Sequence, residues 1–153
     1  MSVCALGLLA LVPLLTYGCD WVSTSGVGAG GNPLESAFTG EQAISTYFQI
    51  YAAILIEEVD FAAVRVGPVL LGYFLLGLLF ALARRPAVRA LTGLLLLPFS
   101  MSLTLVSGFS LLSAQIDGTA SPWLWLFFLS VVTWIVILST RLVGFIARQV
   151  QRV

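Results

Sequence analysis

Histidine and lysine are both absent from this chain of 153 residues, and charged residues make up only 9% of it. An ordinary soluble domain carries roughly 25% charged residues. Without histidine the chain lacks the commonest metal ligand and general base, which excludes haem, zinc and copper sites built on imidazole. Its net charge of zero removes the case for a nucleic-acid partner that rests on basic patches.

Catalytic motifs are missing as well. The sequence contains no phosphate-binding loop, no dinucleotide fingerprint, no cysteine cluster and no nucleophile paired with a base. Its two cysteines, Cys4 and Cys19, are interpreted as small apolar fillers. We therefore expect no enzyme, no cofactor and no metal centre in this chain.

Hydrophobic residues, in contrast, make up 59% of the sequence. No soluble fold of this length hides so much apolar surface, so lipid must form part of the solvent. Spanning the hydrocarbon core takes about 20 helical residues, and the long uncharged runs reach or approach that length. The sequence predicts an all-α integral membrane protein with four transmembrane helices and an amphipathic interfacial helix on the outer side. The predicted spans are residues 1–19, 61–84, 87–114 and 122–147, followed by a cytoplasmic tail at 148–153.

The charges predict an orientation. The predicted spans separate segments that hold all seven acidic residues from segments that hold six of the seven arginines. The exception is Arg65, which lies on the acidic side. Arginine marks cytoplasmic flanks. We therefore expect both termini in the cytoplasm, residues 20–60 and 115–121 outside, and a bacterial inner membrane.

The first span has an alternative interpretation. Residues 14–18 followed by Cys19 loosely resemble a bacterial lipobox, which would make this segment a signal peptide processed at Cys19. The absence of a basic leader, and the poor fit of Thr16 and Tyr17, favour a retained span. The two readings stay open on sequence alone.

The outer segment 20–60 holds the only stretch long enough to fold outside the bilayer. Residues 23–31 are small and glycine-rich, and are predicted to be mobile. Residues 32–35, Asn-Pro-Leu-Glu, predict a helix start, and residues 39–42 offer a second one.

An amphipathic helix is predicted at residues 41–57. Polar residues recur there at helical spacing, opposite an apolar stripe of Ile44, Phe48, Tyr51 and Leu55. The uncharged part is short for a span, so an interfacial helix is favoured over a re-entrant or fifth spanning one. We expect the stripe to dock on a partner protein.

Glu57, Glu58, Asp60 and Arg65 form the densest charge cluster of the chain. Intramembrane carboxylates often mark ion or proton paths, so a possible ion site is one interpretation. An ordinary acidic linker with an arginine that reaches toward water is the favoured alternative.

Lipid tails are as apolar as leucine, so helices in a membrane pair through small residues and hydroxyl groups. The predicted packing residues are Gly72, Gly77, Ser100, Thr104 and Ser107. The hydroxyl stripe could instead line a pore, but packing is favoured.

Leu75, Leu79 and Leu96 are expected to face lipid.

Three functions remain open. The favoured one is a non-catalytic subunit of a larger envelope complex of the respiratory, photosynthetic, secretion or conjugation type, with membrane lipid and other membrane subunits as partners. The second is a small homo-oligomeric channel or hole-forming protein. The third is a small transporter, which would normally need a membrane-embedded charge.

Overall fold

The computed structural model describes residues 3–27, 33–55 and 66–150, which are mostly helical. The elements, in chain order, are α1 (Val3–Thr16), β1 (Asp20–Val27), β2 (Pro33–Thr39), α2 (Gly40–Leu55), α3 (Val66–Leu82), α4 (Pro86–Asp117), β3 (Thr119–Ala120) and α5 (Pro122–Val150).

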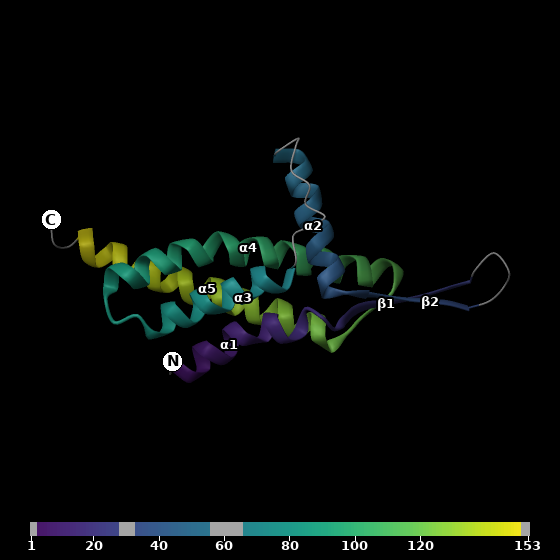
Figure 1. The fold of residues 1–153 in the computed structure, drawn as a ribbon, viewed down its shortest axis with the longest axis horizontal. Coiled ribbons are helices and arrows are strands. Elements are labelled where there is room, and N and C mark those ends of the chain that lie inside the picture. Colours follow the sequence, from purple (N-terminus) through teal and green to yellow (C-terminus); the bar gives the residue numbers. More distant parts are fainter. Residues whose placement is uncertain (1–2, 28–32, 56–65, 151–153) are drawn as a thin grey trace.

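Four helices form an up-and-down bundle along the long axis of the molecule (Figure 1). Helix α4 packs against α3 and α5, and α1 packs against the same two helices, which closes the bundle. Large side chains fill the centre, and Leu103, Leu124, Phe127, Val131 and Trp134 are almost fully buried.

Two of these helices are long and apolar enough to cross a membrane, by length and composition. They cover Pro86–Ile116 in α4 and Pro122–Arg148 in α5. Helices α1 and α3 are shorter apolar helices of 14 and 17 residues. The predicted spans 87–114 and 122–147 fall within α4 and α5, and α5 continues to Val150 through part of the predicted tail.

A small antiparallel sheet corrects the all-α prediction. Strands β1 and β2 pair from Asp20↔Thr39 to Val27↔Pro33, and β3 adds to β1 through Val22↔Ala120 and Ser23↔Thr119. The predicted helix start at Asn-Pro-Leu-Glu was wrong for the described residues 33–35, which belong to strand β2. The described residues 23–27 of the stretch predicted to be mobile belong to strand β1. Hydrogen bonds between the strands satisfy the backbone groups of these residues. This long-range stabilisation outweighs the local preference of the sequence for a helix start.

The second predicted helix start is the one that α2 uses. The amide of Gln42 donates to Thr39 Oγ1 at 3.3 Å, and the amide of Thr39 donates to Gln42 Oε1 at 3.0 Å. This reciprocal pair is a capping box, which satisfies amides that the first helical turn leaves unpaired. The observed helix covers Gly40–Leu55, whereas residues 56 and 57 of the predicted range lie outside the described residues.

Trp21 joins the sheet to the bundle. Its side chain is fully buried, and its Nε1 donates to the carbonyl oxygen of Thr16 at 3.0 Å. Its ring centroid lies 4.5 Å from that of Phe127 on α5, and its carbonyl accepts from the amide of Ser121 at 2.9 Å. A Cβ on Gly40 would overlap its indole ring. Three distant segments of the chain therefore meet at one side chain.

The Gly40 contact gives a stability prediction. Gly40→Ala should lower the free energy of unfolding by about 1–3 kcal/mol, because the added methyl group collides with the rigid indole of Trp21. Gly18→Ala is the matched control, since a Cβ there meets no atom within 4 Å. Thermal unfolding of both variants in detergent, followed by circular dichroism, compares their Tm values. An equal Tm for the two variants would contradict the tight junction.

Candidate functional site

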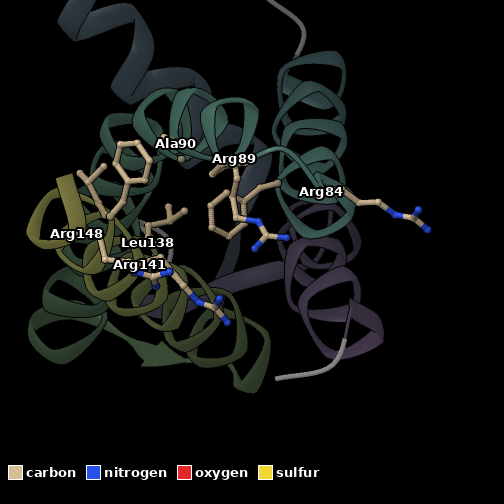
Figure 2. Close-up of a pocket in the computed structure, with 11 residues that line it drawn as sticks. Arg84, Arg89, Ala90, Leu138, Arg141 and Arg148 are labelled. Carbon is tan, nitrogen blue, oxygen red and sulfur yellow. The ribbon is translucent and has the colours of Figure 1, made fainter. Parts of the chain in front are cut away.

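A cavity of about 260 Å³ opens between the α3–α4 turn and the last turns of α5 (Figure 2). We call it the arginine cavity. It is lined by Phe80, Arg84, Pro86, Arg89, Ala90, Gly93, Leu138, Arg141, Leu142, Phe145 and Arg148.

The cavity exists because antiparallel helices bring separate arginines to one end of the bundle. Arg84 lies within the short connection from α3 to α4, and Arg89 lies in the first turn of α4, where Pro86 is the first helical residue. Arg141 and Arg148 lie seven residues apart on α5, which is about two helical turns and therefore one face. Since α4 begins where α5 ends, these two pairs meet.

The arginine side chains differ in how they are held. One guanidinium nitrogen of Arg89 (Nη2) donates to the carbonyl oxygen of Ala83, an oxygen just beyond the end of α3. Nε of Arg148 donates to the carbonyl of Gly144 at 3.2 Å. Figure 2 shows Arg84 extending away from the others. Among the residues that the structure describes, no carboxylate forms an ion pair with these four arginines.

The inner wall of the cavity is apolar and firmly packed. Phe80 is buried and meets Trp134 edge to face, with ring centroids 5.8 Å apart. A Cβ on Gly93 would lie 3.2 Å from Phe80 Cε2 and 3.7 Å from Leu138 Cδ2. Glycine at this position therefore lets the phenyl ring and the leucine close the wall behind the arginines.

The chemistry of this lining is that of an anion receptor. Guanidinium groups carry a permanent charge and donate paired hydrogen bonds that match the oxygens of phosphate or carboxylate. They accept no proton at physiological pH, so they supply no general base. In the described part of the chain, no group of three or more histidine, cysteine, aspartate or glutamate residues is placed to hold a metal ion.

The predicted packing glycines differ from one another. Gly77 is buried, and a Cβ there would lie 2.9 Å from Ala10 Cβ on α1 and 3.4 Å from the ring of Trp134. A Cβ on Gly72 would meet no atom within 4 Å. The close approach between α1 and α3 is therefore at Gly77, and Gly72 takes no part in it.

The hydroxyl stripe of α4 lies in the interior of the bundle. Ser100 is fully buried and shares a 3.0 Å hydrogen bond with the Tyr73 hydroxyl of α3. Thr104 Oγ1 donates to the Ser100 carbonyl at 2.9 Å, and Ser107 Oγ donates to the Leu103 carbonyl at 2.8 Å. These bonds satisfy the hydroxyl groups within the protein.

One expected lipid-facing residue is an exception. Leu75 and Leu79 are exposed, but Leu96 is only 1% exposed and belongs to the core. That prediction was wrong because Leu96 precedes Ser100 by four residues, about one helical turn, so it lies on the same buried face of α4 as Ser100 and Ser107.

The predicted docking stripe is partly used inside the chain. Ile44 is fully buried, and the ring of Phe48 lies 6.5 Å from that of Phe99 on α4. The bundle covers Ile44, which corrects the expectation that this residue contacts a partner. Tyr51 and Leu55 lie further along α2, and their side chains are outside what the structure describes.

The predicted charge cluster of Glu57, Glu58, Asp60 and Arg65 lies outside the described residues. The sequence interpretation missed the arginine cavity. The arginines were interpreted as orientation signals, and residues 142–153 as a basic amphipathic tail suited to the anionic inner leaflet. The seven-residue spacing of Arg141 and Arg148 also indicates a common helix face.

No known protein family, no curated protein and no solved structure matches this chain.

The two glycines of α3 make a matched test of helix packing. Gly77→Leu should destabilise the bundle by about 3 kcal/mol, because the leucine must displace Ala10 and Trp134. Gly72→Leu should change stability by no more than about 0.5 kcal/mol, as for other open positions. Thermal unfolding in detergent measures both. Similar losses in the two variants would place the α1–α3 contact elsewhere.

Proposed function

We propose that this chain is a non-catalytic, multi-pass subunit of a larger envelope complex, with four transmembrane helices and both ends in the cytoplasm. The observation that carries the proposal is the apolar exterior of the helical bundle. Large apolar side chains are exposed on every one of its helices, including Leu8 on α1, Leu75 on α3, Leu105 on α4 and Leu129 on α5.

This exterior favours lipid as its surroundings. In the most apolar windows of α4 and α5, only 33% and 28% of residues are buried. A core helix of a soluble protein would be mostly buried. Full exposure of a leucine to water costs about 1.5–3 kcal/mol relative to burial, and these half-exposed leucines would each cost roughly half of that in water, whereas lipid tails remove the cost.

Helix lengths also support the proposal that these helices span a membrane. On α5, exposed Trp123 and Trp125 precede Arg141 by 18 and 16 residues, which is about 27 and 24 Å of helix. This spacing places the two tryptophans at one border of a ~30 Å hydrocarbon layer and the arginine at the other border, and both residue types are favoured at such borders. Helices α1 and α3 reach about 21 and 26 Å, which is about 9 and 4 Å short of that layer. Local thinning of the bilayer or flanking side chains that reach toward water can offset such a mismatch.

The bundle also separates charge in space. The α3–α4 turn and the end of α5 carry the described arginines, and the first residue of α1 lies at that same end (Figure 1). The described acidic residues belong to β1, β2, the start of α2 and the end of α4, at the opposite end. The positive-inside bias then supports a cytoplasmic arginine end.

The outer unit, which comprises β1, β2 and α2, is the proposed partner surface. The two strands continue past the end of the bundle, and α2 runs across the bundle direction and leaves its side (Figure 1). Phe38 of β2 is 44% exposed and Ile50 of α2 is 57% exposed. These two side chains replace Ile44 as the apolar contacts proposed for a neighbouring subunit.

The interior of the bundle favours a structural subunit over a channel. Tyr73 and Ser100 bond to each other, and Trp134 and Phe127 fill the centre of the bundle. Such a packed interior suits a structural role.

Topology can be measured by cysteine labelling. In a Cys4→Ser, Cys19→Ser background, Ser23→Cys should react with a membrane-impermeant thiol reagent added to intact cells. Ala87→Cys should react only after the membrane is opened. Both positions are exposed on the protein surface, so access depends on the side of the membrane. Labelling of both cysteines in intact cells, or of Ala87→Cys alone, would contradict the proposed orientation.

Partner association can be measured by gentle detergent extraction and identification of co-purifying chains. Ile50→Ala should reduce recovery of a defined partner set several-fold, because apolar anchors carry most of the affinity of an interface. Ile146→Ala is the matched control, since Ile146 is 52% exposed but lies near the end of α5 that carries arginine. Recovery of the chain alone, as a pure homo-oligomer, would contradict the subunit proposal.

A further inference from the structure

We propose that the arginine cavity binds the phosphate-bearing headgroup of an anionic phospholipid from the cytoplasmic leaflet. This inference rests on the membrane placement proposed above, but it does not depend on the existence of a protein partner. Basic pockets between transmembrane helices on the cytoplasmic side are suited to such headgroups.

Charge is the first argument. Four arginines line one cavity, and the described acidic residues belong to elements at the other end of the bundle. Arg84 extends away from the other three arginines (Figure 2). The guanidinium groups of those three repel one another, and the repulsion grows where low-dielectric protein replaces water. An anion bound among them removes that repulsion and takes up their hydrogen-bond donors.

The arrangement of the donors is the second argument. Arg89 reaches the site from α4, and Arg141 comes from the facing helix α5 (Figure 2). The bond from Arg89 to the Ala83 carbonyl fixes one side of its guanidinium and leaves other N–H groups for a ligand. Arginine presents five donors in a rigid fork, so one internal bond does not exhaust it. A phosphate group between the two helices could therefore accept from both.

Size and surroundings identify lipid as the source of the phosphate. A cavity of about 260 Å³ is smaller than the roughly 300–1,000 Å³ of sites that enclose a drug-sized ligand. It can hold a headgroup but not acyl chains. Leu91 on α4 and Val143 and Ile146 on α5 are large apolar side chains exposed near the arginines in sequence. They continue the apolar exterior along which acyl chains would run.

Binding can be measured on the full chain purified in a neutral detergent. Native mass spectrometry during titration with phosphatidylglycerol or phosphatidylcholine should show one tightly bound phosphatidylglycerol and no comparable phosphatidylcholine. Arg141→Gln with Arg148→Gln should weaken phosphatidylglycerol binding about 25-fold, or about fivefold for each near-surface arginine removed. Neither residue bonds to another helix in the described part of the chain, so the double variant should keep its fold by circular dichroism.

Arg85→Gln is the matched control. Arg85 lies beside Arg84 in the α3–α4 turn and carries the same charge as the four arginines of the cavity, but it does not line the cavity. Unchanged phosphatidylglycerol binding in this variant supports a site, whereas an equal loss in Arg85→Gln would show general surface attraction and overturn the proposal. Arg89→Gln should also weaken binding, since it removes the α4 donor.

Inorganic phosphate separates the two possible sources of the ligand. Bound phosphatidylglycerol should raise the Tm, because it binds only the folded chain. Millimolar phosphate should neither displace the lipid nor raise the Tm, and phosphate that did both would overturn the lipid assignment. The topology experiment is independent of this one. A correctly oriented chain that does not bind phosphatidylglycerol would overturn only this inference, and failure of the cysteine labelling would overturn the membrane placement itself.

Discussion

Close packing at a few small side chains is the constraint on which the helical bundle depends. Its exterior carries many large apolar side chains, as its interior does, so in a lipid environment hydrophobicity alone does not distinguish the two faces of a helix. What distinguishes them is shape: Ala10 and Trp134 fit against Gly77, and Gly93 leaves room for Phe80. The buried Tyr73–Ser100 hydrogen bond adds a directional contact that lipid cannot replace.

The polar chemistry of the chain lies at the two ends of this bundle. At one end Trp21 ties α1, the sheet and α5 together, using its indole N–H, its ring and its backbone carbonyl. This junction sets the direction in which the strands and α2 leave the bundle. At the other end the arginines of α4 and α5 come together around a cavity with an apolar wall.

The proposed roles of the two ends complement each other. Arginines that favour the cytoplasmic side during insertion are the same residues that line the arginine cavity. A bound anionic headgroup would hold that end at the membrane border, because the lipid is itself fixed there. The outer unit, carried on a bundle held at both borders, would then present Phe38 and Ile50 at a defined height above the bilayer. Rigid presentation lowers the ordering cost of binding a neighbouring protein.

The sequence by itself determined the long apolar helices and their charge pattern, because hydropathy and local charge depend only on neighbouring residues. It also indicated the start of α2 at Thr39, since a capping box is local chemistry. The strands β1 and β2 were decided by tertiary structure, because their hydrogen bonds join segments whose local signals favoured a turn and a helix. The burial of Leu96, in contrast, follows from local spacing, because Leu96 precedes Ser100 by one helical turn and shares the buried face of the hydroxyl stripe. The arginine cavity also needed the fold, since Arg89 and Arg141 are far apart in sequence and meet only because α4 and α5 run antiparallel.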